Sequence, residues 1–435
     1  MCEAGVSLCE TVGSHVASTV AKTQPRFHEE APVNATTIQR GALGGVRILD
    51  MATVLAGPAG ATLCADHGAD VVKLELPDGS DALRHMQPVK EDVPLWWKVA
   101  NRGKRGITLD VRKPKGRELL LAMLPQFDVL VENFRTGTMD RWGLDIETLH
   151  RANPRLVVVR LTGFGQTGPY RGRPGYARIF EAMSGFTNLT GTPDGPPMHS
   201  NFPIGDAVAG LFCAFSIAAE IARLRGDPQA GGVEVDLSAT EALFRLLEPL
   251  AVEHEQLGQV RRRAGNSTTY TAPSNMYRSV EGTYFSLVAS SQSVYERLCE
   301  ALERTEWIAD PRFATNPKRV QNMQALDFEL AAWFEARPFD VISARLEQYD
   351  IPFTKVYTIE DIEADPHFQA RGAIIRLPDP DYGSVPAPCI VPRVAGRKMP
   401  VPRSGPAVGE HNAEVYAAFG VGEPELAALR AEGVV

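Results

Sequence analysis

The residue with the clearest chemical potential is Asp206, within the segment NFPIGDAVAGLFCAFSIAAEIARLRG (201–226). It follows a glycine and precedes a long apolar run, so it stands at the start of a predicted helix. An aspartate there can cap the helix by accepting hydrogen bonds from free backbone N–H groups. The positive end of a helix also favours an ionised carboxylate, which can act as a nucleophile. This stretch alone therefore leaves both a capping and a catalytic interpretation open.

Elsewhere the chain lacks the patterns that usually carry nucleophilic or metal chemistry, since it has no GxSxG motif, no HExxH motif and no CxxC pair. His199 is the histidine nearest to Asp206 along the chain, and we expect it in a loop. Scattered cysteines favour a reducing, cytoplasmic location and argue against structural zinc or another metal site; they are Cys2, Cys9, Cys64, Cys213, Cys299 and Cys389. The lone carboxylate remains the leading catalytic candidate.

Basic residues gather in the segment WWKVANRGKRGITLDVRKPKGRE (96–118), although the chain carries a net charge of −8. The overall charge argues against a general nucleic-acid binder. A basic cluster near strand ends suits a small polyanion, and a solvated surface is the alternative interpretation. Arg135 and Arg141 add positive charge near the end of another predicted strand. Because open α/β sheets bind ligands at such ends, the two clusters favour a phosphorylated cofactor.

The segment GFGQTG (163–168) matches the GxGxxG pattern of nicotinamide-binding proteins. That fingerprint requires a helix to begin at the glycines, so that its N-terminus meets the pyrophosphate. Pro169 and the following YRGRPG cannot open a regular helix. We therefore expect a tight loop here and disfavour a nicotinamide dehydrogenase.

Short apolar runs alternate with helical patterns over the first half of the chain. We expect helices over 57–68, 115–125 and 206–226, and a strand leading into a helix over 233–251. Alternation of this kind predicts parallel βαβ units and a doubly wound α/β sheet; its expected strands are 46–52, 69–76, 105–111, 127–134 and 156–164.

Changes in residue pattern along the chain suggest a large and a small domain. Residues 1–43 lack a long hydrophobic period and the apolar core of a signal peptide, so we expect a loosely ordered extension. The apolar run 211–222 is interrupted by Ser216 and Glu220, so no membrane span is expected. The expected units are a large domain of residues 44–257 and 373–435, a linker or loop at 258–276, and a small α+β domain at 277–372.

Several segments together resemble the class III coenzyme A transferase family, which also contains the α-methylacyl-CoA racemases. The similarity runs through nearly everything after residue 43, and its motifs are VRILDMATVLAGPAGATLCADHGADVVKLELP, NRGKRGITLDV, LVENFRTGTMDRWGLD, LTGFGQTGPY, FPIGDAVAG, DPRFATNPKRVQN and DPHFQARGAI. The resemblance implies a Rossmann-like large domain, a smaller α+β domain and a ring-shaped chain that interlocks with a second copy. It also implies that acyl-CoA and a carboxylic acid are the substrates, with no tightly bound cofactor, metal, nucleic acid or membrane partner.

The family's nucleophile is the aspartate of a GD motif, which here is Asp206. The resemblance implies that it attacks a donor acyl-CoA to give a mixed anhydride and free CoA thiolate. The thiolate then attacks the aspartyl carbonyl, which releases the donor acid and leaves an aspartyl-CoA thioester. The acceptor acid runs these steps in reverse. The segment RAGNSTTY (263–270) is a candidate lid.

The family's CoA-binding positions fall on residues that follow the predicted strands. Leu76 stands where a relative can have a phosphate-binding arginine, so one contact differs. Arg112 occupies a position that is often basic, within a segment, 109–112, that flanks the nucleotide. The residues carried over are Val54, Leu55, Ala56, Lys104, Arg105, Leu109, Arg112, Asn133, Phe134, Arg135, Arg141, Tyr176 and Ala177.

Two positions depart from the family pattern. Tyr176 replaces the histidine of the racemases, which argues against racemisation because that reaction needs two proton-moving groups. Ala177 replaces a common acidic residue, which is consistent with an engineered change, a weakened subunit with a competent partner chain, or substrate adaptation. Glu181, one turn further on, either replaces the missing carboxylate or is an ordinary helix residue, and the second interpretation is favoured.

Leu55 supports substrate adaptation, since a relative that acts on a small diacid has glutamine there. An apolar pocket suits a large or aromatic acceptor such as benzylsuccinate, with succinyl-CoA as donor. A homodimer is the leading expectation for assembly. A non-catalytic CoA-binding subunit of a heteromeric transferase is the alternative from a different class, and an acyl-CoA racemase is a weaker one.

Overall fold

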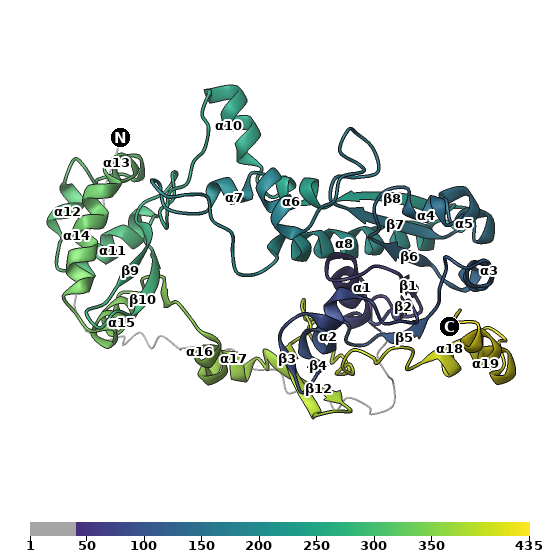
Figure 1. The fold of residues 1–435 in the computed structure, drawn as a ribbon. Helices are drawn as coiled ribbons and strands as arrows, with labels where there is room; N and C mark the ends of the chain where they lie inside the picture. Colours follow the sequence, from purple (N-terminus) through teal and green to yellow (C-terminus); the bar gives the residue numbers. More distant parts are fainter. Residues whose placement is uncertain (1–40) are drawn as a thin grey trace, which may run out of the picture. The chain divides into compact units, whose positions relative to one another are not determined.

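The protein is described by a computed structural model that covers residues 41–435. The predicted N-terminal extension, 1–43, lies almost entirely outside these residues. A six-stranded sheet with the order β5-β2-β1-β6-β7-β8 forms the centre of the fold (Figure 1). All its neighbouring strands are parallel; the strands are β1 (Arg47–Asp50), β2 (Asp70–Glu75), β5 (Arg105–Thr108), β6 (Val129–Glu132), β7 (Val157–Thr162) and β8 (Val233–Ser238). The predicted α/β class with a parallel sheet is confirmed.

The strand order reverses between β1 and β6, because β1 has its chain successor β2 on one side and β6 on the other. In open parallel sheets such a reversal leaves a crevice at the carboxyl ends of the strands, where ligands bind. The inner strands β1, β6 and β7 are short and largely apolar because both faces of the sheet are covered by helices, whereas the edge strand β8 alternates apolar with exposed acidic residues.

One face of the sheet is covered by α1 and α8, with α6 and α9 at their ends. A Cβ atom on Gly60 of α1 would lie 2.7 Å from the Cβ of Cys213, so glycine allows the close approach of α8. Within residues 41–435, α8 is long and apolar enough to cross a membrane, but it packs along α1 and the sheet as a core helix. The bounds are α1 (Ala56–Asp66), α6 (Ala177–Met183), α8 (Ile204–Gly226) and α9 (Ala239–Arg245).

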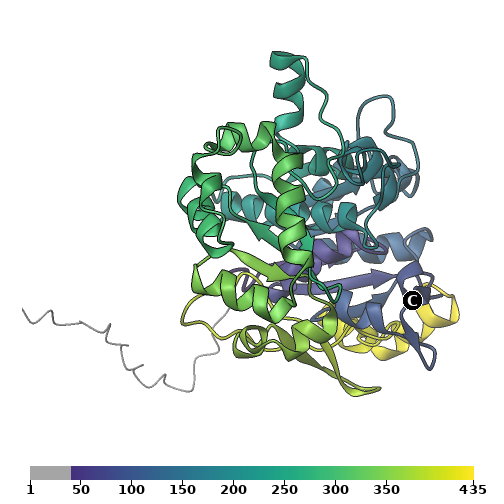
Figure 2. The same cartoon turned by 90° about the vertical axis from the view of Figure 1, so that its left-hand side faces the viewer.

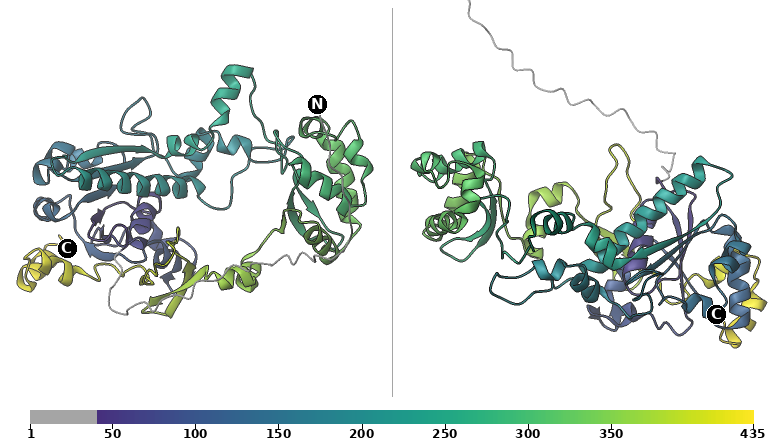
Figure 3. Two further views of the ribbon diagram at one scale, coloured as in Figure 1. Left: turned by 180° about the vertical axis from the view of Figure 1, so that it is seen from behind. Right: turned by 90° about the horizontal axis from the view of Figure 1, so that it is seen from above.

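The opposite face of the sheet carries a second core, which includes the C-terminal residues Val434 and Val435. Its helices are α3 (Pro114–Met123), α4 (Thr138–Arg141), α5 (Ile146–Ala152), α18 (Asn412–Ala418) and α19 (Glu423–Ala431). Helix α18 contacts β5 (Figure 1), and the C-terminal helices, in yellow, lie beside blue segments of the large core in both panels of Figure 3. Tyr416 donates a hydrogen bond to the carbonyl of Thr108, at 2.7 Å, which ties α18 to the end of β5.

A separate hydrophobic core is built from an antiparallel three-stranded sheet and five helices, drawn in green in Figure 2. Arg319 is fully buried in it, where its guanidinium donates to the carbonyls of Ala272, Phe313 and Ser290. The elements are β9 (Ser274–Arg278), β10 (Tyr284–Val288), β11 (Phe353–Lys355), α11 (Gln292–Ala301), α12 (Glu306–Ala309), α13 (Asn316–Gln321), α14 (Met323–Glu335) and α15 (Phe339–Gln348).

The remaining elements are short. Pro249 begins a new helix, so the helix expected to run to residue 251 ends earlier, at Arg245. The hairpin β12–β13 is joined to α2 by ion pairs of Lys98 with Asp379 and Asp381. The elements are β3 (Val89–Lys90), β4 (Val93–Pro94), α2 (Leu95–Ala100), α7 (Phe186–Leu189), α10 (Pro249–Leu257), α16 (Ile359–Ala364), α17 (Pro366–Ala370), β12 (Ile374–Asp379), β13 (Gly383–Pro388) and two 3-10 helices (Ala82–His85, Leu124–Gln126).

Candidate active site

A cavity of about 200 Å³ lies where the strand order reverses, next to the carboxyl ends of β1, β6 and β7. Among residues 41–435, its charged lining residues are Asp206 and Arg135. Seven of the residues singled out from the sequence line this cavity, namely Val54, Leu55, Ala56, Asn133, Arg135, Tyr176 and Asp206. The full set is Thr53, Val54, Leu55, Ala56, Asn133, Arg135, Leu161, Thr162, Gly163, Pro174, Gly175, Tyr176, Phe180 and Asp206.

Asp206 is positioned by the first turn of α8. The helix begins at Ile204, so Asp206 lies inside the first turn and not at the capping position, which Pro203 occupies. This corrects the capping interpretation. A Cβ atom on Gly205 would lie 3.0 Å from the carbonyl oxygen of Ala177, so glycine lets α6 approach the start of α8 closely.

Burial raises the pKa of the Asp206 carboxyl to about 6, and the negative charge of Glu181 adds to this rise. At neutral pH the group is still ionised, because the pH exceeds that pKa. A carboxylate with a raised pKa is a stronger base and a better nucleophile than an exposed one. The site can therefore attack an electrophilic carbonyl.

Glu181 is not the ordinary helix residue that the sequence favours. Its side chain is 1% exposed. One carboxylate oxygen accepts a hydrogen bond from the backbone N–H of Gly205 at 3.2 Å, and the other lies 3.0 Å from Nδ1 of His199. Glu181 thus joins the start of α8 to the loop that carries His199, where that histidine was expected.

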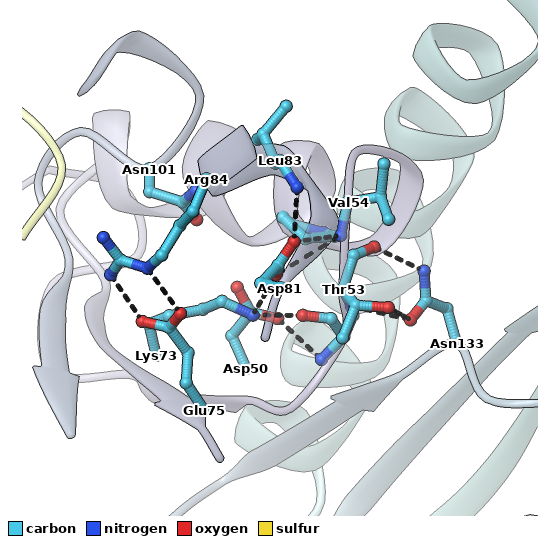
Figure 4. Close-up of polar contacts among 12 residues, drawn as sticks. Asp50, Thr53, Val54, Lys73, Glu75, Asp81, Leu83, Arg84, Asn101 and Asn133 are labelled. Carbon is cyan, nitrogen blue, oxygen red and sulfur yellow. Dashed lines mark hydrogen bonds and ion pairs between the residues drawn. The ribbon is translucent and has the colours of Figure 1, made fainter. Parts of the chain in front are cut away.

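The loop after β1 is held tightly against the cavity. Val54 has φ of 63°, a left-handed conformation that is strained for a β-branched residue. The carboxylate of Asp81 accepts hydrogen bonds from the N–H groups of Val54, at 3.1 Å, and Leu83, at 3.0 Å (Figure 4). Asn133 accepts from the N–H of Thr53 at 2.7 Å and donates to its carbonyl at 2.8 Å. These bonds hold the strained backbone in place.

Two buried lysines lie beneath this loop. The Lys104 ammonium donates to Asp50, at 2.8 Å, and also to Pro58 and Asn101, and the side chain is completely buried. Burial lowers the pKa of Lys104, and the charge of Asp50 opposes that effect. Lys73 donates to the carbonyl of Ala52 and lies 3.7 Å from Asp81. Lys104 therefore points into the protein, which corrects the expectation that it contacts CoA.

A smaller cavity of about 80 Å³ shares Thr53 with the first. Leu109 and Phe134, both singled out from the sequence, line it, and Phe134 meets Trp142 edge to face at a centroid separation of 4.9 Å. The cavity is largely apolar; its lining is Met51, Thr53, Leu74, Glu75, Leu76, Ser80, Asp81, Leu109, Val111, Phe134 and Trp142.

The remaining candidates lie outside both cavities. Arg105 pairs with Asp70 and Glu414, and Arg112 pairs with Asp110 but is half exposed. Arg141 donates to the hydroxyl of Thr138, and Ala177 is buried under α8 without lining the cavity. The candidate lid 263–270 contacts the 188–191 loop and lines neither cavity.

Most basic side chains of the segment 96–118 form ion pairs with acidic residues of the same chain, so the segment as a whole is not a cluster of unpaired positive charge. Arg102, for example, binds Asp66, and Lys115 binds Glu432. Sequence reasoning missed Thr53, Leu161, Thr162 and Phe180 as lining residues. The position of Thr53 and Thr162 at strand ends was a usable signal.

Two further expectations can be compared with the described residues. The GFGQTG segment forms bends without helical structure, and the next helix, α6, begins only at Ala177, so no helix N-terminus is presented for a dinucleotide. Within residues 41–435, no group of three or more His, Cys, Asp or Glu side chains is placed to hold a metal ion.

The fold and the cavity define a Rossmann-like α/β protein with a partly buried carboxylate at the reversal of its strand order. The chain belongs to CoA-transferase family III, whose model matches residues 43–412. It is accordingly an enzyme that transfers CoA between an acyl-CoA and a carboxylic acid.

Among similar proteins, succinyl-CoA–D-citramalate CoA-transferase of Chloroflexus aurantiacus is 38% identical over 90% of this chain and 98% of its own length. The α subunit of succinyl-CoA–L-malate CoA-transferase from Chloroflexus aurantiacus is 31% identical over 95% and 97%. The solved structure of a CAIB/BAIF family protein from Brucella suis has a TM-score of 0.77 at 32% identity, and covers 88% of this chain and 100% of that one.

Proposed function

We propose that this enzyme moves CoA from succinyl-CoA, or a similar donor, to another carboxylic acid, with Asp206 as the covalent nucleophile. The observation that carries the proposal is a carboxylate with a raised pKa inside the cavity at the strand-order reversal. A single carboxylate is sufficient because the acyl group is held as an anhydride or a thioester in every intermediate and so stays reactive. The transfer therefore needs no ATP.

In the first half of the reaction, an oxygen of Asp206 attacks the thioester carbonyl and the carbon–sulfur bond breaks. The CoA thiolate leaves, then attacks the aspartyl carbonyl of the anhydride and releases succinate. In the second half, the acceptor carboxylate attacks the aspartyl-CoA thioester and expels the thiolate. That thiolate attacks the acceptor's acyl carbonyl, which gives the new acyl-CoA and regenerates Asp206.

Two helix N-termini converge on this cavity, since Leu55 and Ala56 open α1 and Asp206 lies in the first turn of α8. The partial positive charge of such ends stabilises anions and oxyanions. We assign this role to the start of α1, beside the strained Val54. Arg135, the cation in the cavity lining, then binds a second carboxylate of the substrate.

The lining combines that cation with apolar Leu55, Leu161 and Phe180. A dicarboxylic acid with an apolar substituent fits this chemistry, and citramalate and benzylsuccinate span a useful range of size. The names of two relatives include succinyl-CoA together with citramalate or malate, which supports a dicarboxylate acceptor. The apolar lining is the observation that favours a larger acid such as benzylsuccinate.

For the nucleotide end of CoA we assign the smaller cavity, because it adjoins the first at Thr53 and is lined by apolar and aromatic groups. Leu109 and Phe134 would contact the adenine ring. Arg112 is half exposed and can turn toward a phosphate, as can Arg141 at the neighbouring helix α4.

The decisive test is to trap the covalent intermediate. Incubation with succinyl-CoA, followed by hydroxylamine or borohydride and digestion, should modify the peptide that contains Asp206, as measured by mass spectrometry. An Asp206→Asn protein is the control and should stay unmodified. An unmodified wild-type peptide after a panel of acyl-CoA donors would refute the proposal. Acceptors from malate to benzylsuccinate then identify the second substrate by the CoA ester formed.

We further propose that two copies of this chain assemble as an interlocked dimer, as the family resemblance implies. The supporting observation is the outer face of α8, where Leu211 and Phe215 are 58% and 70% exposed. Large exposed apolar groups on one helix face are typical of protein interfaces. Because one relative is an α subunit, a heteromer with a related chain is the alternative.

Replacing Phe215 with glutamate is expected to prevent two chains from assembling as they fold, so that the variant is recovered as monomers, because a charge on this face would have to be desolvated at the interface. Light scattering coupled to size-exclusion chromatography measures the mass directly. Phe328→Glu is the matched control, since Phe328 is 73% exposed on α14, and it should leave the dimer intact. A dimer that survives Phe215→Glu unchanged would place the interface elsewhere.

A further inference from the structure

The buried carboxylate of Glu181 is the most unusual group near the cavity that the transfer reaction does not use. It comes from α6, whose residue Ala177 faces the start of α8 without any charge. Buried carboxylates are rare unless their oxygens are satisfied. Here both oxygens have partners, and both partners belong to the segment that leads into Asp206.

We propose that Glu181 and His199 form a positioning pair for Asp206, in which Glu181 fixes the first turn of α8 and sets the charge beside the nucleophile. This inference rests on the proposed role of Asp206. The Gly205 N–H that donates to Glu181, at 3.2 Å, belongs to the residue directly before Asp206. A shift of the Glu181 carboxylate would therefore turn the nucleophile.

His199 anchors the other side of Glu181. Its Nδ1 lies 3.0 Å from the carboxylate and 3.4 Å from the hydroxyl of Thr187. The imidazole side chain is 30% exposed, whereas that of Glu181 is 1% exposed, so His199 covers the buried carboxylate from the solvent side. Because the imidazole faces one carboxylate oxygen, the charge of Glu181 is shared between His199 and the start of α8.

Few other charges compete for this role. Arg135 and Tyr176 share the cavity lining with Asp206, while Arg178 on α6 and Glu241 and Arg245 on α9 are exposed. The charged groups of the other elements that pack on α8 are engaged elsewhere: Asp66 of α1 with Arg102, Arg160 of β7 with Glu132 and Glu234, and Asp236 of β8 with the Gln166 N–H.

The pair predicts opposite effects for two substitutions. Glu181→Gln keeps an oxygen for the Gly205 N–H but removes the negative charge beside Asp206. The acidic limb of the profile, meaning the pH range over which kcat/KM falls as the solution becomes more acidic, should therefore move to lower pH by roughly half to one unit. At pH 5, kcat/KM divided by its plateau value should therefore be about three- to five-fold greater in the variant than in wild type. His199→Ala removes the partner of the other Glu181 oxygen, so more of the Glu181 charge faces Asp206 and the limb should move up. A purely structural role would lower activity without these opposite shifts.

The experiment measures pH profiles of CoA transfer for wild type, both variants and Glu241→Gln, an exposed glutamate on α9 that should leave the profile unchanged. Trapping of the Asp206 adduct is run on the same proteins. If wild type forms the adduct but Glu181→Gln leaves the limb in place, the positioning role is wrong and the transfer chemistry stands. If wild type forms no adduct with any donor, the proposed function itself fails. If Glu181→Gln does not fold, the pH profile of His199→Ala still tests the pair, because His199 lies in the loop before α8 and not in the buried start of that helix.

Discussion

Replacing Asp206 with asparagine is expected to lower CoA transfer by about 10³-fold or more, while making the folded protein more stable. An amide of similar shape fills the same space but cannot form the acyl anhydride. Residual turnover, if any, would come from contamination by aspartate. CoA binding should survive, because neither cavity depends on the charge of Asp206 for its shape.

The gain in stability follows from the raised pKa of Asp206, about 6 in the folded protein against an ordinary value of 3.8. Ionisation is easier in the unfolded chain, so a charged Asp206 costs folding free energy at every pH above its folded pKa. The cost is about 1–2 kcal/mol after allowance for partial exposure, or a few degrees in Tm. It shrinks as the pH falls through about 6 and vanishes below the unfolded value.

Calorimetry of wild type and Asp206→Asn at pH 7.5 and pH 4.5 tests this pattern, with transfer assays at the higher pH. The expected outcome is a higher Tm for the variant that is clear at pH 7.5 and largely lost at pH 4.5. A variant that is less stable at pH 7.5 would mean that the carboxylate is held by favourable contacts, and would return Asp206 to a structural role. Retained transfer activity would exclude it as the nucleophile.

The central sheet was predictable because parallel strands covered on both faces are short continuous apolar runs, such as VVVRLT in β7. Helix α8 was predictable because its apolar run is long and begins after Pro203. Val54 and Asn133 were assigned from the family resemblance. They line the cavity with Asp206 because both follow parallel strands, whose carboxyl ends share one edge of the sheet.

Long-range pairing was not predictable from local pattern. Lys104 looked like a ligand for phosphate because the sequence around it is basic, whereas its partner Asp50 lies 54 positions away. Glu181 looked like a helix surface residue because only the folded chain brings His199 and Gly205 to it. A sequence pattern indicates which residues belong to the same helix or strand. It does not indicate which charged side chains from other helices or strands will contact them.

Lys104→Met is expected to cost about 3–5 kcal/mol of unfolding free energy, because it leaves Asp50 ionised and unpaired in a fully buried place. The group beneath the loop contains two lysines, Lys73 and Lys104, and two aspartates, Asp50 and Asp81, so it is neutral as a whole. Removing one cation breaks that neutrality. Urea denaturation of the full chain measures the loss.

A second variant separates lost charge balance from lost packing. Adding Asp50→Asn to Lys104→Met restores neutrality and keeps an oxygen for the N–H of Ala52, which Asp50 accepts at 3.0 Å. The double variant should recover most of the lost stability, since replacing both partners of a buried pair is far less costly than removing one. Lys115→Met is the exposed control, because Lys115 pairs with Glu432 at the surface, and it should cost less than about 1 kcal/mol.

The outcome also bears on the cavity, because Asp50 and Lys73 hold Ala52, which leads into the strained Val54. If the double variant regains stability but transfers CoA slowly, the ion pairs have a second role in keeping the loop shaped for substrate. If it regains both, the buried charges serve folding alone and any neutral arrangement of similar size suffices. A Lys104→Met protein as stable as wild type would contradict the premise, since Asp50 would then tolerate isolation in the core.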